Sequence, residues 1–303
     1  MSTVSAALVA ARAKLPASEA RLLLGHLLAR EPAWLIAHDD EVLEEAVLRR
    51  FASLVARRAG GEPLAYVVGQ REFFAREFAV SPAVLIPRPE TELLVEIALA
   101  RIAANEVPKA ERNGDSGQAT ARASDACAGT RVLDLGTGSG CIAITLALEC
   151  PRVQVSAVDA SAGALAVARR NAEQLGAAVR FLHSDWFTAL AGESFDLIVA
   201  NPPYIAAADP HLAAGDLRHE PVGALAGGVD GLASIRRIIA LAPVHLAPGG
   251  QLWLEHGYDQ AGVVRELLAA AGFADTEQHV DLAGIVRVSG GRLRLASETP
   301  IAL

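Results

Sequence analysis

The sharpest chemical signal in the sequence is the run Asn201-Pro202-Pro203-Tyr204, which directly follows the apolar segment FDLIVA. The prolines fix their own φ angles and restrict the residue before each of them, so the run is rigid. The side-chain oxygen of Asn201 and the carbonyl oxygen of Pro202 then form two fixed acceptors. Such a pair suits an NH2 group on a conjugated carbon, as in a carboxamide or an exocyclic base amine. The ring of Tyr204 can lie against that planar group.

A conjugated NH2 group is a poor nucleophile because its lone pair is delocalised. Hydrogen bonds from its two N–H groups draw the nitrogen toward a tetrahedral shape and direct the lone pair at an electrophilic methyl group. No base is needed beforehand, because the nitrogen becomes strongly acidic only once it is methylated. We therefore expect Asn201, Pro202 and Tyr204 to catalyse by positioning, and Pro203 to share in binding the substrate.

A glycine turn follows another apolar segment, RVLDL, and precedes the stretch CIAITLALEC. Its members are Gly136, Thr137, Gly138, Ser139 and Gly140. In a doubly wound sheet this turn lies at the carboxyl end of a strand, where backbone N–H groups and a helix N-terminus can receive an anionic group. That group is either a pyrophosphate or the carboxylate of an amino-acid-like cofactor. A dinucleotide fingerprint expects Gly or Ala where Cys141 stands, which argues against NAD.

Three further positions extend this predicted nucleoside pocket. Asp159 ends the segment VQVSAVD, about 20 residues after the turn, where a carboxylate accepts hydrogen bonds from ribose hydroxyls. Asp159 and Ser161 also suit a helix N-cap. In the run SDWF, Asp185 and Trp186 are expected to read an adenine by its amino group and its face, although a core aromatic remains an alternative for Trp186.

The elements that must position these residues alternate between apolar strands and amphipathic helices, which predicts an α/β fold with a doubly wound, mostly parallel sheet. Residues 1–70 show helical spacing of apolar residues and are expected to form a small N-terminal helical bundle. Residues 71–85 predict a β-hairpin linker, and residues 86–303 the catalytic domain. Within it, the segment at about 105–129 lacks apolar periodicity and is expected to be a mobile insertion, and the tail after Gly291 an extension.

Composition excludes several classes of protein. The chain of 303 residues is 52% hydrophobic and 20% charged, as in globular proteins, and its net charge of −8 argues against a broad nucleic-acid surface. Its cysteines, Cys127, Cys141 and Cys150, form no C-x-x-C pair, and its histidines lack metal-ligand spacing, so we expect no metal. Neither an export signal nor an uncharged segment of the roughly 18 residues that cross a bilayer is found, so we expect a cytoplasmic protein without membrane contact.

The glycine turn, Asp159, SDWF and NPPYI, in this order, resemble a class I S-adenosylmethionine-dependent methyltransferase acting on a planar amino group. The segments LIPRPETE, NPPYIAAADPHLAAGDLRHEP, LEHGYDQ, EARLLLGHLL and GEPLAYVVGQREF are similar to the HemK/PrmC protein-glutamine methyltransferases. This resemblance covers nearly the whole chain. It implies a Rossmann-like, seven-stranded sheet, S-adenosylmethionine as cofactor, and N5-methylation of the glutamine in the Gly-Gly-Gln motif of peptide chain release factors. It further implies that the glycine turn, Asp159, Trp186 and Asn201 contact the cofactor, and that residues 201–204 hold the glutamine.

Four other protein classes share part of this pattern. A sister family that methylates a ribosomal protein also carries NPPY, but IPRPETE favours the release-factor branch. A DNA adenine-N6 methyltransferase shares the motif, yet the chain lacks a basic domain with which to grip phosphates. An NAD oxidoreductase conflicts with Cys141 and offers no hydride partner, and a non-catalytic binding module has no need of NPPY.

Overall fold

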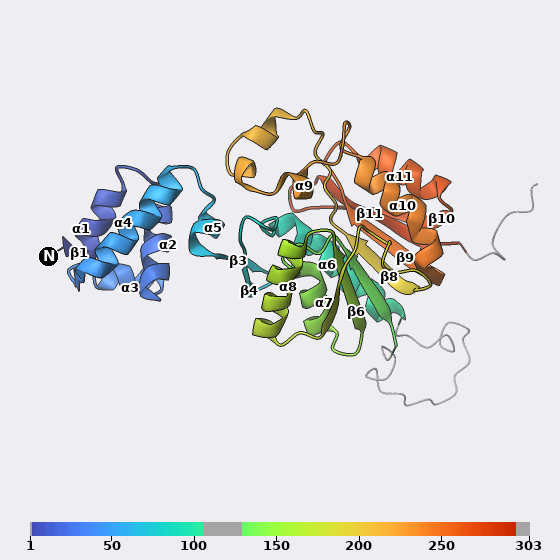
Figure 1. Ribbon diagram of the computed structural model, residues 1–303, viewed down its shortest axis with the longest axis horizontal. Helices are drawn as coiled ribbons and strands as arrows, with labels where there is room; N and C mark the ends of the chain where they lie inside the picture. The colour runs from blue at the N-terminus through green and yellow to red at the C-terminus, as the bar shows by residue number, and fades with distance from the viewer. Residues whose placement is uncertain (1, 106–128, 295–303) are drawn as a thin grey trace, which may run out of the picture.

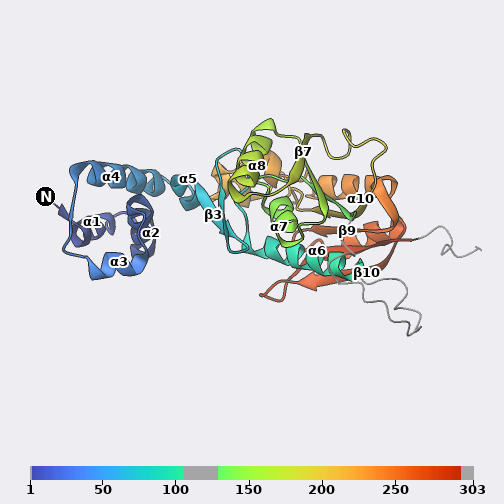
Figure 2. The same cartoon turned by 90° about the horizontal axis from the view of Figure 1, so that it is seen from below.

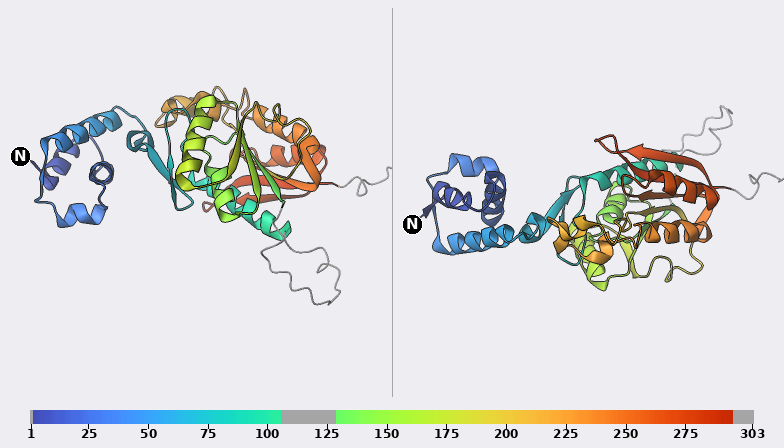
Figure 3. Two further views of the ribbon diagram at one scale, coloured as in Figure 1. Left: turned by 60° about the horizontal axis from the view of Figure 1, so that its bottom comes forward. Right: turned by 90° about the horizontal axis from the view of Figure 1, so that it is seen from above.

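The computed structural model describes residues 2–105 and 129–294 (Figure 1). The predicted insertion at about 105–129 lies almost entirely outside the described residues, as does the end of the predicted C-terminal extension. The chain forms a helical bundle at its N-terminal end and a larger unit of sheet and helices, which stand side by side in every view (Figures 1 and 3).

The N-terminal bundle contains four helices, which Figure 2 shows packed together, and their apolar side chains form one core. They are α1 (Val4–Ala11), α2 (Ala17–Leu28), α3 (Pro32–Ala37) and α4 (Glu45–Ala59). The predicted bundle is confirmed. Helix α1 begins at a capped residue, because Oγ1 of Thr3 accepts a hydrogen bond from the backbone of Ala6. A pair of two-residue strands, β1 (Ser2–Thr3) and β2 (Val42–Leu43), was not predicted, since so short a pairing leaves no periodic signal.

Helix α5 (Leu64–Val68) and a hairpin of β3 (Gln70–Phe73) and β4 (Arg76–Ala79) connect the bundle to the sheet unit. The turn residues Phe74 and Ala75 both have positive φ angles, which match the twist of a two-residue hairpin. Phe73 and Phe78 are buried in the core of the sheet unit, so the hairpin is anchored there. The domain limits at residues 70 and 85 stay a prediction.

The larger unit is built on a sheet of seven strands, which confirms the predicted fold class. The strands are β5 (Arg131–Leu135), β6 (Gln154–Asp159), β7 (Val179–His183), β8 (Phe195–Ala200), β9 (Leu246–Glu255), β10 (Phe273–Val280) and β11 (Val286–Leu293). Their order is β10-β11-β9-β8-β5-β6-β7; β11 pairs antiparallel with β10 and with β9, and all the other pairs are parallel. The carboxyl ends of β5, β6 and β8 therefore meet at one edge.

Helices cover both faces of this sheet. Helices α6 (Glu92–Asn105), α7 (Cys141–Glu149) and α8 (Ala162–Leu175) contribute to the core on one face, and α10 (Ala233–His245) and α11 (Ala261–Ala270) to that on the other. Neighbouring residues of β5 show the alternation, since Val132 packs into the first core and Leu133 into the second. Within the described ranges, no helix combines the length and apolar character needed to cross a lipid bilayer.

Candidate active site

The glycine turn joins β5 to α7 and is held against the neighbouring strand. The backbone N–H groups of Gly136 and Thr137 both donate to the carbonyl oxygen of Val158, each at 2.9 Å. Gly138 adopts a φ of +56°, and a Cβ atom built there would meet nothing within 4 Å. The turn therefore presents bare backbone to open space, as close approach of a ligand requires.

Asp159 ends β6 and supports this turn from the side. Its Oδ2 accepts a hydrogen bond of 2.9 Å from the backbone of Gly138, and its Oδ1 one of 2.8 Å from the backbone of Ser161. The N-cap of α8 is Ser161, whose Oγ accepts from the backbone of Ala164 at 3.1 Å. Of the two residues that suit the helix N-cap, Ser161 takes this role and Asp159 does not, and each oxygen of Asp159 keeps a further lone pair for another donor.

These residues line a cavity of about 330 Å³, within the range of small-molecule sites. Its walls come from the segment after the hairpin, the glycine turn, the ends of three strands and a loop that includes α9 (Val222–Leu225). The lining residues are Ala83, Val84, Leu85, Gly136, Gly138, Asp159, Ala160, Ser161, Ala164, Ser184, Trp186, Asn201, Pro203, Pro221, Gly223 and Ala224. Segments far apart in the sequence, from residue 83 to residue 224, thus share one cavity.

The two residues predicted to bind adenine, Asp185 and Trp186, have different surroundings in the structure. Trp186 has a φ of +53°, and its ring lies 3.4 Å from the place where a Cβ atom of Gly136 would stand, so it packs over the glycine turn. Asp185 does not line the cavity. Its carboxylate forms an ion pair with Arg237 at 2.7 Å instead. The role of Asp185 at the cofactor stays a prediction that no contact in this cavity supports.

The remaining members of the turn are buried beneath the cavity. The hydroxyl of Thr137 donates to Oδ2 of Asp134 at 2.7 Å, and the carbonyl of Ser139 accepts from Nδ2 of Asn171 at 2.8 Å. Asp134 was not predicted as a site residue. Burial raises the pKa of its carboxyl to about 7. The sequence feature that could have indicated Asp134 is an acidic residue inside the apolar segment RVLDL.

The NPPY run is fixed by side chains from distant parts of the chain. Nδ2 of Asn201 donates to Oγ1 of Thr91 at 3.0 Å, and that hydroxyl donates to Oε2 of Glu255 at 2.7 Å. The hydroxyl of Tyr204 donates to the other carboxylate oxygen, Oε1, at 3.0 Å. Among the described residues, none donates to Oδ1 of Asn201 or to the carbonyl oxygen of Pro202. The two predicted acceptors are thus left available.

Burial controls the protonation of the groups around NPPY. It raises the pKa of the Tyr204 hydroxyl, and the neighbouring Glu255 carboxylate raises it further, so this hydroxyl stays protonated and donates. Burial also raises the pKa of Glu255, whereas hydrogen bonds from Thr91 and Tyr204 and the charge of Arg287 oppose that rise. Tyr204 is therefore a hydrogen-bond donor and not a base.

A second cavity, of about 530 Å³, lies on the other side of the run. Tyr204 lines it together with Glu255, Arg88, Arg287 and part of the loop at 205–217. Arg88 is held in turn by an ion pair with the buried Glu220. Since Asn201 and Pro203 line the first cavity and Tyr204 the second, NPPY stands between the two.

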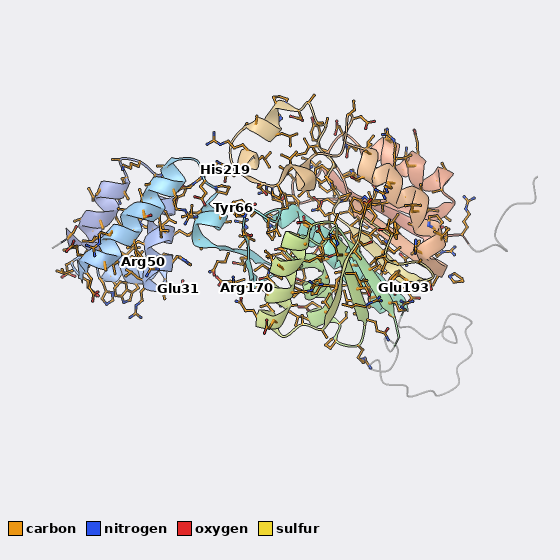
Figure 4. All side chains as sticks on the ribbon, viewed as in Figure 1. Glu31, Arg50, Tyr66, Arg170, Glu193 and His219 are labelled. Carbon is orange, nitrogen blue, oxygen red and sulfur yellow. The ribbon has the colours of Figure 1, made fainter. Side chains whose placement is uncertain are left out.

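Val84, in the wall of the first cavity, also accepts a hydrogen bond from helix α5. The hydroxyl of Tyr66, which Figure 4 places at the junction of the two units, donates to the carbonyl oxygen of Val84 at 2.6 Å.

In the described part of the chain, no group of three or more His, Cys, Asp or Glu side chains is arranged to hold a metal ion.

The strand order and the glycine turn at the cavity define a class I S-adenosylmethionine-dependent methyltransferase. The fold is similar to that of a crystallised methyltransferase from Pyrococcus furiosus, at 18% identity and a TM-score of 0.50, with 80% of this chain and 100% of that chain covered. Residues 118–217 match the model of the methyltransferase small domain, and residues 1–69 that of the PrmC N-terminal domain. The expectation of S-adenosylmethionine as cofactor is confirmed.

Comparison with curated relatives shows to which family of this methyltransferase class the chain belongs. The release factor glutamine methyltransferase of Burkholderia pseudomallei is 53% identical over 286 residues, which cover 92% of this chain and 93% of that protein. The corresponding protein of Bordetella pertussis is 51% identical over 280 residues, covering 92% of this chain and 96% of the relative. This chain belongs to the release factor glutamine methyltransferase family. The predicted resemblance is thereby confirmed, and the oxidoreductase and binding-module alternatives are discarded.

Proposed function

We propose that this chain transfers a methyl group from S-adenosylmethionine to the side-chain amide nitrogen, N5, of the glutamine in the Gly-Gly-Gln motif of peptide chain release factors. The observation that supports the proposal is the hydrogen bonding of the Asn201 side-chain amide. Its Nδ2 is bound to Thr91, so its Oδ1 is left as an acceptor beside the carbonyl oxygen of Pro202. Two acceptors without protein donors match the two N–H groups of a primary amide.

The first cavity has the chemistry that S-adenosylmethionine requires. The Asp159 carboxylate has lone pairs for the ribose hydroxyls, and the Trp186 ring offers a flat apolar face to the base. The open backbone at Gly138 and the start of α7 suit the amino-acid end of the cofactor. When bound, the cofactor supplies an electrophilic methyl group on a sulfonium. Asp185 is kept as a further proposed contact, on the sequence pattern alone.

The residues of NPPY act on the substrate by holding it. Oδ1 of Asn201 and the carbonyl oxygen of Pro202 accept the two amide N–H groups, and Tyr204 packs against the amide plane. This geometry restricts the glutamine to a near-attack arrangement, which is worth about 7 to 11 kcal/mol in favourable cases. Because the proton becomes acidic only after transfer, water accepts it. The second cavity, on the Tyr204 side, is the proposed entrance for the glutamine.

The domain limits fit this function as proposals. Residues 1–70 would recognise the release factor, residues 71–85 would link the two units, and residues 86–303 would carry catalysis. Release factors act in the cytoplasm, so we place the chain there. The substrate is a protein, and nucleic acid, metal and membrane have no role in the proposal.

Mass spectrometry tests the proposed function directly. The chain is incubated with S-adenosylmethionine in three separate reactions. The first contains a release factor, the second ribosomal protein and the third duplex DNA that contains adenine. The expected result is the mass of one added CH2 group on the Gly-Gly-Gln peptide alone, and its loss when that glutamine is changed to asparagine. Methylation of the ribosomal protein or of the DNA, with an unmodified release factor, would overturn the proposal in favour of one of the alternatives.

A further inference from the structure

A buried chain of hydrogen bonds extends behind the NPPY run. It passes from Asn201 to Thr91 and then to Glu255, which also accepts from Tyr204. Thr91 and Glu255 are 2% and 1% exposed, so bulk water does not compete for the bond between them. Thr91 ends the short helix η1 (Pro89–Thr91), and Glu255 ends β9. Neither residue lines the cavity that contains Asn201.

The direction of each bond in this chain follows from the carboxylate. Glu255 accepts a hydrogen bond from each of two hydroxyl groups, so the single hydroxyl hydrogen of Thr91 points at Glu255. Oγ1 of Thr91 then has only lone pairs to offer to Asn201. The amide of Asn201 can satisfy Oγ1 with Nδ2 but not with Oδ1. Its oxygen is therefore turned away from Thr91 and toward the cavity.

The same carboxylate fixes both ends of the reactive run. Oε2 orients Asn201 through Thr91, and Oε1 holds the Tyr204 hydroxyl. Burying this carboxylate is costly, so its two hydroxyl donors and the nearby charge of Arg287 on β11 are needed to offset that cost. A purely apolar core would fill the space as well. It would leave the orientation of the Asn201 amide undetermined.

We propose that Thr91 and Glu255 are positioning residues for methyl transfer, which set the Asn201 amide so that its oxygen, and not its NH2 group, faces the substrate. The inference rests on the proposed function. Without the Thr91 hydroxyl, the productive orientation of Asn201 leaves a partly buried N–H group without an acceptor. The flipped orientation instead points that NH2 group at the N–H groups of the substrate amide.

The test compares T91V and T91S with the wild-type chain in steady-state kinetics on a release factor. For T91V, kcat is expected to fall by about 10- to 100-fold, the effect of one partly buried donor left unpaired beside the substrate. KM for the release factor and Kd for S-adenosylhomocysteine are expected to stay near the wild-type values. T91S retains the hydroxyl and is expected to restore most of kcat.

T145V is the matched control. Thr145 is also a fully buried threonine, and within the described residues its hydroxyl has no hydrogen-bond partner. This variant removes a hydroxyl of the same kind without touching the network, so kcat should be unchanged. If T91V keeps the kcat of T145V, the proposal is overturned. It is overturned equally if T91S loses as much activity as T91V, because shape and not the hydroxyl would then matter.

E255Q provides a second variant that keeps the size of the side chain. Its single amide oxygen replaces one carboxylate oxygen, so either Thr91 or Tyr204 faces an NH2 group. We expect a reduced kcat with a near-normal Kd for S-adenosylhomocysteine, and a wild-type kcat would contradict the role of Glu255. If the wild-type chain leaves the release factor unmodified, the proposed function is rejected. That result differs from a wild-type kcat in the variants, which would reject only the positioning role.

Discussion

The backbone N–H of Gly138 donates a hydrogen bond of 2.9 Å to Oδ2 of Asp159. This bond joins the turn after β5 to the end of β6, so the part of the cavity proposed for the amino-acid end of the cofactor is coupled to the part proposed for its ribose. The second oxygen of Asp159 accepts from Ser161 at the start of α8. One carboxylate therefore organises three elements around the cavity.

Changing Asp159 to alanine should weaken cofactor binding. The variant removes acceptors for the ribose and leaves the Gly138 N–H unpaired. Charge-assisted hydrogen bonds are worth about 1.5 to 3 kcal/mol, so Kd for S-adenosylhomocysteine should rise by about 10- to 100-fold in calorimetry. Glu173, exposed on α8, provides the control E173A, whose Kd should match the wild type. Equal affinities for D159A and E173A would contradict the role of Asp159.

Changing Asn201 to alanine should separate chemistry from cofactor binding. Loss of one preorganised polar group at a reacting centre costs about 10²- to 10³-fold in kcat. Kd for S-adenosylhomocysteine should change far less than in D159A, because Asn201 contributes only part of one wall. Methyl transfer to a release factor and calorimetry measure the two quantities. Wild-type turnover by N201A would reject catalysis by the acceptor pair.

Arg58 should stabilise the junction between the helical bundle and the sheet unit. Its guanidinium donates to Glu19 on α2 at 2.9 and 3.1 Å and to Asp216 in the loop at 205–217 at 2.9 Å. Hydrogen bonds to charged groups contribute about 1.5 to 3 kcal/mol, and part exposure of Asp216 reduces this, so R58M should lower the free energy of unfolding by about 1 to 2 kcal/mol.

The control for R58M is R49M in the same helix. Arg49 pairs with Glu45 where both side chains are largely exposed, and such pairs contribute about 0 to 1 kcal/mol. Urea unfolding measures both variants. A midpoint for R58M that equals the midpoint for R49M would show that the bonds from Arg58 to Glu19 and Asp216 together contribute no measurable stability.

Asp134 should make the stability of the chain depend on pH. Burial raises its pKa from an ordinary value near 3.8 to about 7, so the folded protein binds the proton more tightly than the unfolded protein. Its contribution to stability is complete below pH about 4 and is lost as the pH rises to about 7. Melting temperatures of D134N and the wild type, measured at pH 5 and pH 8, should show D134N gaining relative to the wild type at the higher pH. A constant difference would contradict the shift.

The part of the site that the sequence predicts is the part at the ends of parallel strands. The glycine turn, Asp159 and Asn201 each follow an apolar segment, and parallel strands place such positions at one edge of the sheet. This rule required no knowledge of tertiary packing. It also explains why no contact in the cavity supports the predicted role of Asp185, since a residue after a strand is brought to the edge but its side chain can still turn outward, here to Arg237.

Thr91, Glu255 and the wall around Val84 were not predicted, because their roles depend on contacts between distant segments. Glu255 carried a signal nonetheless, since it ends the apolar run QLWL much as Asp159 ends its own strand. Helix α10 was also missed. It carries Pro243 near its end, a residue that usually interrupts a helix, and it follows a long irregular loop.

The hydrogen bond between Thr91 and Glu255 joins residues 164 positions apart, and Glu255 ends one of the last strands of the sheet. Contacts of such long range form late, because a large loop must close first. During synthesis, NPPY leaves the ribosome well before Glu255 does. A nascent chain therefore contains its reactive motif before the carboxylate that orients it has been synthesised, so the Asn201 amide is set in place only after β9 has been translated.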